Sequence, residues 1–225
     1  MSSPLPQILS NLHAAATAPG RPTPALLAVS KTQPADAVAE LAAQGQRAFG
    51  ENYVQEALDK MQALQHLPLE WHLIGHLQSN KADAVATHFD WVQSVDRPRL
   101  VTALARHRPA GRASLNVLIQ VNIDDEASKH GCTPEAVDAL AAAIAAELTL
   151  RLRGLMAIPA PWPDAGRRHA AFARMRALFD TLALQHAHVD TLSMGMSSDY
   201  AEAIAEGATL VRIGTALFGA RPRPA

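Results

Sequence analysis

Short apolar runs alternate with longer amphipathic stretches along most of the chain. The runs are rich in β-branched and aromatic side chains, which is typical of buried strands. The stretches between them are rich in Ala and Leu and space their apolar residues three and four apart, which predicts helices. The clearest helices are predicted at 35–43, 133–148 and 167–184, and the strands at 25–29, 47–49, 71–74, 91–95, 116–121, 154–158, 191–194 and 209–213.

Eight strands alternating with helices over about 200 residues match a single (β/α)₈ barrel of the TIM type. An open, doubly wound parallel sheet has the same alternation and stays as an alternative. An additional helix at 7–16 precedes the first strand, and we expect it to pack over one end of the barrel. Breaks rich in proline, at 19–24 and 159–163, read as loops rather than linkers, so residues 1–225 are expected to form one domain.

The amino-acid composition limits which molecules the protein is expected to bind and where it is expected to reside. Lys and Arg number 20 against 21 Asp and Glu, so we expect neither nucleic acid nor an anionic membrane as a partner. Cys132 is the only cysteine, which excludes an intramolecular disulfide and a cysteine-based zinc site and favours a reducing compartment. The N-terminus lacks a basic start before a long apolar run, and no stretch reaches the roughly 20 apolar residues of a membrane span. We therefore expect a cytoplasmic protein.

Unusual polar clusters follow the predicted strands. In a barrel, the carboxyl ends of the strands form the functional face, so clusters far apart in sequence would converge on one mouth. Closure makes the first and eighth strands neighbours, which would place Lys31 beside Arg212 and Gly214. The clusters are SKT at 30–32, GEN at 50–52, HLIGHLQSNK at 72–81, SMGMSSD at 193–199 and RIGT at 212–215.

Lys31 follows the apolar run LLAVS, so its amine would emerge from a packed strand end into a partly desolvated site. Desolvation lowers the pKa of a lysine amine, and only the deprotonated amine attacks an aldehyde. This placement favours Schiff-base chemistry. The alternative is an exposed lysine at a strand end, because lysines are usually exposed.

The clusters after the seventh and eighth strands offer hydroxyl groups and glycines. Loops at these two positions often bind phosphate in such barrels. Ser198 and Asp199 could instead cap the helix that begins near Tyr200. The phosphate-site candidates are Ser193, Ser197, Gly214 and Thr215.

Arg212 lies within the eighth strand, where its charge must face the mouth or find a partner. A bound ligand is one such partner, and Glu51 is the alternative carboxylate. Toward an aromatic nitrogen a guanidinium can only donate a hydrogen bond, which would leave a pyridine unprotonated and a poor electron sink.

His72 and His76 are four residues apart, a spacing that suits metal ligands on a helix. Their segment reads as strand followed by loop, and no HExxH motif or matched carboxylate accompanies them. A structural, hydrogen-bonded role is therefore expected for both, and no metal site is predicted.

Several long motifs in a fixed order identify a protein family more specifically than any single short pattern. The segments LLAVSKTQ, FGENYVQE, WHLIGHLQSNK, VLIQVNI, LRGLMAI, LSMGMSSDYAEAI and VRIGTALFG together resemble the pyridoxal phosphate homeostasis protein family over residues 26–221. The resemblance implies a barrel like the N-terminal domain of alanine racemase, with pyridoxal 5'-phosphate (PLP) held as a Schiff base on Lys31. It also implies cofactor contacts from Asn52, Ser193, Arg212, Gly214 and Thr215, with Arg212 near the pyridine nitrogen and Met156 and Met194 along the ring face.

The same resemblance implies a protein that binds PLP and maintains its supply and the amino-acid balance, without established turnover. Racemases of this fold take one proton-transfer group from a second domain, and none is expected here because the sequence ends six residues after Gly219. Acids or bases that could substitute are Tyr53, Tyr200, His72 and His76.

A PLP-dependent amino-acid racemase or related weak enzyme therefore remains the alternative function, and an interaction module built on the barrel is a third. The expected partners are PLP and apo forms of PLP-dependent enzymes, with the chain itself a monomer. Lys81 and Lys129 stay open as positions for a second cofactor molecule.

Overall fold

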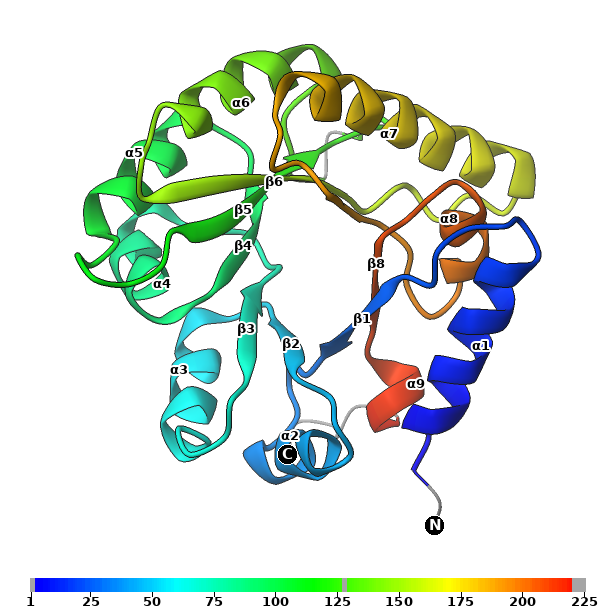
Figure 1. Cartoon of the computed structure of the whole chain (residues 1–225), viewed down its shortest axis with the longest axis horizontal. Coiled ribbons are helices and arrows are strands. Elements are labelled where there is room, and N and C mark those ends of the chain that lie inside the picture. The colour runs from blue at the N-terminus through cyan, green and yellow to red at the C-terminus, as the bar shows by residue number, and fades with distance from the viewer. Residues whose placement is uncertain (1–2, 127–128, 220–225) are drawn as a thin grey trace.

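Eight parallel strands close into a barrel in the order in which they follow one another along the chain (Figure 1). The structure is a computed structural model and describes residues 3–126 and 129–219. Strand β8 pairs with β1, and this pairing sets Arg212 opposite Leu27. The prediction of a closed barrel is confirmed, and the open sheet is wrong. The strands are β1 (Ala25–Val29), β2 (Ala48–Glu51), β3 (Glu70–Leu73), β4 (Trp91–Val95), β5 (Leu115–Val121), β6 (Leu150–Ala157), β7 (Thr191–Ser193) and β8 (Leu210–Ile213).

Helices surround the barrel and bury one apolar face each against it (Figure 1). The predicted helix at 35–43 is confirmed in full, and the long helix after β6 extends two residues beyond its predicted start and one beyond its end. The helices are α1 (Leu5–Thr17), α2 (Ala35–Ala43), α3 (Val54–Ala63), α4 (Ala82–His88), α5 (Pro98–His107), α6 (Val137–Ala145), α7 (Ala165–Gln185), α8 (Tyr200–Ala205) and α9 (Thr215–Phe218), with short 3₁₀ turns η1 (Ser79–Lys81) and η2 (Pro134–Ala136).

Helix α1 lies in the outer layer rather than over an end of the barrel, so this part of the prediction is wrong (Figure 1). Leu5, Ile8, Leu12 and Ala16 recur at helical spacing and are buried in the large hydrophobic core. The helix that follows β8 has only four residues, and α1 packs against α8 and against this short helix. It thereby covers strands that α9 is too short to cover.

Apolar side chains occupy both faces of the central strands. All five residues of β4 are buried, as expected for a parallel strand covered by helices on one side and by the barrel interior on the other. Trp91, Leu118 and Met156 form a small apolar cluster that is separate from the large core. This continuous burial explains why apolar runs, rather than strict alternation, mark the strands in the sequence.

The start of β6 differs from the prediction by four residues. Arg151 and Arg153 interrupt its apolar pattern, but the strand pairs with β5 from Leu150 onward. The Arg153 guanidinium forms an ion pair with Asp190 at 2.6 Å and lies over the Trp91 ring, 4.6 Å from its centroid. These partners let a charged residue sit within the strand.

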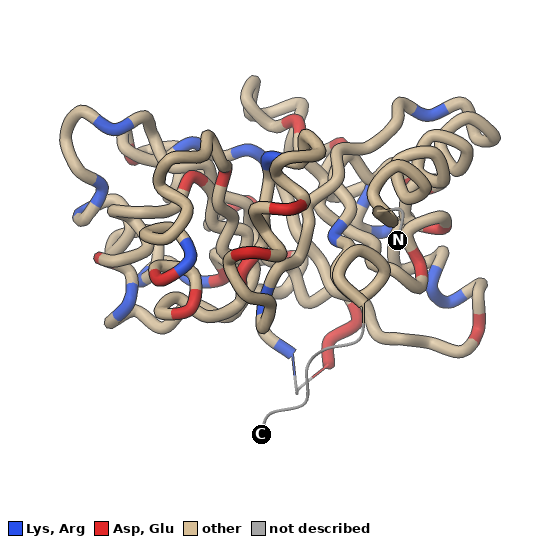
Figure 2. The backbone as a smooth tube through the Cα atoms, turned by 90° about the horizontal axis from the view of Figure 1, so that it is seen from below, with Lys and Arg blue, Asp and Glu red and all other residues tan. Residues whose placement is uncertain are grey.

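Along the described backbone, acidic and basic residues are interspersed in the view of Figure 2. In the described part of the chain, no helix combines the length and the apolar content needed to cross a membrane.

Candidate cofactor pocket

A pocket of about 300 Å³ opens at the carboxyl ends of the strands, where the polar clusters were expected to meet. It is lined by Lys31 and Arg212, so strand closure brings these two side chains to one site as predicted. The lining comprises Val29, Lys31, Gln33, Asn52, Ile74, Ile158, Met196, Ser197, Ser198, Arg212, Gly214, Thr215 and Gly219.

The turn that carries Lys31 rests on a buried ion pair. The Nζ of Lys60, on α3, lies 2.7 Å from the Oε1 of Glu51 at the end of β2 and donates to the backbone carbonyl of Ser30 at 2.7 Å. The Ser30 hydroxyl donates to the same Glu51 oxygen at 2.6 Å. Lys31, which is half-buried, is therefore held in place through the residue that precedes it.

The residue after Lys31 is also fixed. Thr32 has φ 64°, a left-handed conformation that is uncommon for a β-branched residue. Its amide donates to Glu56 Oε1, which also accepts a hydrogen bond from Lys60 at 2.6 Å. Such strained conformations persist where surrounding contacts over-determine them, and they cluster at functional sites.

Glu51 is fully buried, and burial raises the pKa of its carboxyl, while hydrogen bonds from Lys60 and Ser30 offset part of the rise. Since Lys60 and Ser30 hold this carboxylate, Glu51 is not the partner of Arg212 that the sequence left open. Arg212 instead donates to the hydroxyl of Ser193 and to the carbonyl of Ala157, each at 2.7 Å. Burial lowers its pKa to about 10, which still leaves the guanidinium protonated at neutral pH.

A chain of buried hydrogen bonds leads from Arg212 through the barrel interior. Ser193 Oγ donates to Gln93 Oε1 at 2.7 Å, Gln93 Nε2 lies 3.0 Å from His72 Nδ1, and His72 Nε2 lies 2.8 Å from Glu70 Oε1. Gln93 can only donate through Nε2, so Nδ1 of His72 accepts and Nε2 donates to the carboxylate. Each member thus donates to the next, and the chain ends at Glu70.

Asn52 follows β2, and its side-chain Oδ1 is buried without a hydrogen-bond partner among the described residues. The loop after β3 approaches the Asn52 backbone closely. A Cβ added to Gly75 would lie 2.7 Å from the Asn52 Cα, so only glycine fits at this position. The approach fixes Asn52 at the edge of the pocket.

The loop after β7 contributes Met196, Ser197 and Ser198 to the lining, and the two serines are exposed. Asp199 occupies the N-cap position of α8 but makes no side-chain cap there, and its Oδ1 accepts the Met196 amide at 2.6 Å. The carboxylate therefore holds the loop rather than capping the helix. Gly214 packs against β1, because a Cβ there would lie 3.2 Å from the Val29 carbonyl oxygen.

Six of the nine residues expected at the cofactor line the pocket: Lys31, Asn52, Ser197, Arg212, Gly214 and Thr215. The other three lie behind this surface. Ser193 is fully buried and supports Arg212, Met156 belongs to the small cluster inside the barrel, and Met194 lies in the large core. Gln33, Ile158 and Met196 also line the pocket, and the sequence did not single them out although each lies within or at the end of a quoted motif.

The fold and site together are a (β/α)₈ barrel whose mouth pocket has Lys31, Arg212 and several hydroxyl groups among its described lining residues. Residues 4–222 match the family described as alanine racemase, N-terminal domain. Alanine racemase from Corynebacterium glutamicum has the same fold, with 21% sequence identity and a TM-score of 0.68 over 96% of this chain and 61% of the racemase.

Relatives with higher sequence identity identify the family to which the chain belongs. The pyridoxal phosphate homeostasis protein of Pseudomonas aeruginosa is 56% identical over 217 residues, covering 96% of this chain and 93% of the relative. The protein of the same name from Escherichia coli is 54% identical over 222 residues, covering 96% and 95%. This chain belongs to the pyridoxal phosphate homeostasis protein family.

One similar protein of known structure has PLP bound. The structure of PipY from Synechococcus elongatus, described as having PLP bound, is 40% identical with a TM-score of 0.80, covering 94% of this chain and all of that one.

Proposed function

We propose that this chain binds PLP in the pocket at the barrel mouth, through a Schiff base formed by the Lys31 amine with loss of water, and serves as a carrier that maintains the supply of the cofactor. Membership of the family and the bound PLP of its cyanobacterial relative support this function. The observation that carries the site assignment is the convergence of Lys31 and Arg212 in one pocket.

The residues that line the pocket fit PLP. Asn52 Oδ1 is a buried acceptor without a partner among the described residues and can meet a polar substituent of a ligand. Ser197, Ser198 and Thr215 offer hydroxyl groups, and Gly214 leaves backbone accessible, which suits a phosphate. Ile74 and Ile158 supply apolar surface for a ring.

When bound, PLP supplies an aldehyde that combines with amines and a ring that withdraws electrons. Arg212 remains protonated and can only donate a hydrogen bond, so a ring nitrogen placed against it would accept that hydrogen bond and would stay unprotonated. Arg212 thereby limits electron withdrawal by the ring, which favours storage and delivery over demanding carbanion chemistry.

The ionisable groups of the pocket also favour a carrier. Among the lining residues that the structure describes, Lys31 and Arg212 are the ionisable side chains. Racemisation needs an acid and a base on opposite faces of the substrate, and of the four candidates from the sequence none lines this pocket: Tyr53, Tyr200, His72 and His76. We propose that residues 1–225 act as one domain with this single role, supplying PLP to apo forms of PLP-dependent enzymes.

Substitution of Lys31 tests the site. Lys31→Ala should abolish the visible absorption of bound PLP after dialysis while circular dichroism remains that of the wild type. Lys81→Ala, an exposed lysine outside this pocket, is the matched control and should keep the band. Retention of the band by Lys31→Ala would show that another residue holds the cofactor.

A second experiment separates carrier from enzyme. The loaded protein is incubated with single L-amino acids in deuterated water, and α-proton exchange and product chirality are followed. We expect no more than slow exchange, without multiple turnovers to the D-isomer. Repeated turnover would overturn the carrier proposal, whereas faster transfer of PLP to an apoenzyme than to free solution would support it.

A further inference from the structure

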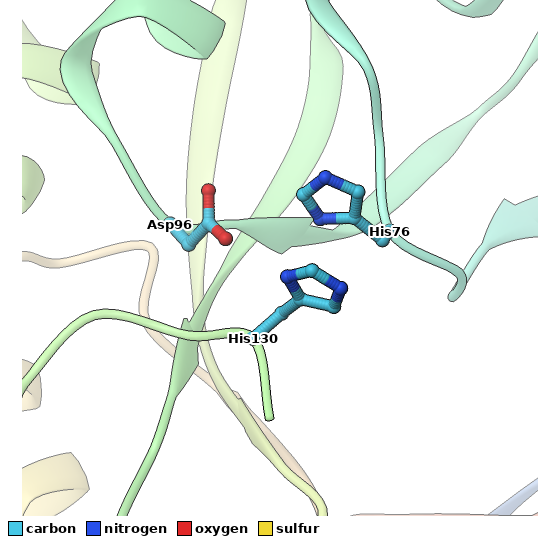
Figure 3. A group of neighbouring side chains, drawn as sticks. All are labelled: His76, Asp96 and His130. Carbon is cyan, nitrogen blue, oxygen red and sulfur yellow. The ribbon is translucent and has the colours of Figure 1, made fainter. Parts of the chain in front are cut away.

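Three side chains outside the cofactor pocket gather at the barrel mouth. His76 lies in the loop after β3, Asp96 directly follows β4, and His130 lies in the loop after β5 (Figure 3). One ligand atom from each residue lies within 4.8 Å of the other two. Figure 3 shows a ring nitrogen of each histidine on the side that faces the Asp96 carboxylate.

We propose that His76, Asp96 and His130 bind a divalent transition-metal ion, with zinc the clearest probe. Two imidazoles and one carboxylate are a recurrent ligand set for zinc and its neighbours, whereas calcium and magnesium prefer oxygen ligands alone. The sequence favoured a structural role for His76 because it was considered only with His72, which lies inside the barrel. The partner histidine comes from a different loop.

The separation of the ligand atoms is close to that of a formed site. Three atoms no more than 4.8 Å apart all lie within about 2.8 Å of a common point, and metal bonds of about 2.0–2.2 Å require them to move inward by less than about 1 Å. The two rings are nearly parallel, at 16°, with centroids 3.7 Å apart. Their in-plane nitrogen lone pairs therefore run side by side, and both rings must turn about their side-chain bonds to aim the nitrogens at one ion.

The backbone under the two histidines is fixed. His76 follows Gly75, which packs against the Asn52 backbone. The carbonyl of His130 accepts a hydrogen bond from the Gln120 side chain at 3.0 Å, and the next residue but one, Cys132, bridges to Val121. Ligands on such a scaffold lose little freedom when a metal binds, which favours affinity.

Asp96 has a second partner, the Arg97 guanidinium, at 2.6 Å from Oδ1. A carboxylate has two oxygens and about four lone-pair positions, so it can keep this ion pair and still ligate a metal.

The site would be open to solvent on one side. Both histidines are exposed and Asp96 is half-buried. His76 also lines a second cavity of about 360 Å³, together with Asn52, Tyr53 and Lys81. Three protein ligands would leave one or more coordination positions facing this cavity, available to water or to a small anionic ligand.

Zinc titration of the full-length chain, made without a histidine tag, tests the proposal. Isothermal titration calorimetry with zinc chloride should show one ion per chain. His76→Gln and His130→Gln should each weaken binding by at least about tenfold, since loss even of groups that only orient ligands costs about this much. His107→Gln is the matched control because His107 Nδ1 lies 3.9 Å from Asp83 and no second imidazole completes a metal-binding group there among the described residues. This variant should bind zinc like the wild type.

Cobalt provides an independent readout. Binding of Co²⁺ at this cluster should give visible ligand-field absorption that is lost in both histidine variants and retained in Lys31→Ala. Circular dichroism of the variants shows whether the fold is intact, which is expected because both histidines are exposed. Absence of saturable zinc binding, or equal binding by the wild type and both histidine variants, would overturn the proposal.

Discussion

The Nη1 of Arg212 donates to the Oγ of Ser193 at 2.7 Å, deep in the barrel, although both residues belong to polar clusters expected at the mouth. The Oγ of Ser193 in turn donates a hydrogen bond to the Oε1 of Gln93. The guanidinium is therefore aimed by a neighbour that does not line the pocket. Under the proposed function, Ser193 would act on the ligand through Arg212.

Ser193→Ala should weaken PLP binding several-fold and lower the free energy of unfolding by about 1–3 kcal/mol, because buried donors and acceptors lose their partner. Fluorescence titration with PLP and urea denaturation measure the two effects. Ser198→Ala, at an exposed serine of the lining, should leave stability within about 0.5 kcal/mol of wild type. Unchanged stability in Ser193→Ala would mean that water replaces the hydroxyl.

Lys60→Met removes the cation from under the turn that carries Lys31. It leaves Glu51 buried opposite an apolar side chain, and breaking one partner of a buried pair costs about 3–5 kcal/mol. We expect this loss in urea denaturation, together with weaker PLP binding because Ser30 loses an anchor. Lys81→Met, at an exposed lysine, should change the unfolding free energy by less than about 0.5 kcal/mol.

Gly75→Ala places a methyl group against the Asn52 backbone, 2.7 Å from its Cα. The backbone must shift, so the free energy of unfolding should fall by about 1–3 kcal/mol and PLP affinity should fall with it. Gly166→Ala within helix α7 is the matched change, since its added methyl meets only a side-chain oxygen of Asp164 at 3.2 Å. Equal stability of the two variants would contradict the close approach.

Buried His72 predicts a pH dependence of stability. Burial lowers the pKa of its imidazole below the ordinary value of 6.5, so below that pH the unfolded chain binds more protons than the folded chain. The stability contributed by neutral His72 is fully present above about pH 6.5 and is lost as the pH falls. Urea denaturation between about pH 7 and pH 5 should show this loss, and His72→Gln should reduce the slope.

His66 is exposed, so His66→Gln is the matched control for His72→Gln. A slope that stays the same in His72→Gln would mean that other groups account for the loss. Glu70 adds a second step at lower pH, because its hydrogen bond with His72 lowers the pKa of the Glu70 carboxyl.

The strand pattern and the gathering of Lys31 and Arg212 followed from the sequence, because buried parallel strands are apolar on both faces and barrel closure fixes which strand ends are neighbours. The sequence did not reveal which polar residues of the strands face inward. The hydrogen-bonded role expected for His72 was right, but its partner Gln93 looks like an ordinary strand residue until β3, β4, β7 and β8 surround a common axis. Likewise, Lys60 reads as a surface residue of an amphipathic helix, and only packing shows it buried against Glu51.

The buried contacts of Lys60 beneath Lys31 bear on how a ligand enters and leaves the pocket. Lys60 ties the ends of β1 and β2 to helix α3, so buried polar contacts brace this rim of the pocket. Across the mouth, Ser197 and Ser198 are exposed in a loop secured by Asp199. The exposed wall is the one that offers hydroxyl groups to a phosphate, so under the proposed function we expect exchange of the ligand to begin there rather than at the rim that carries Lys31.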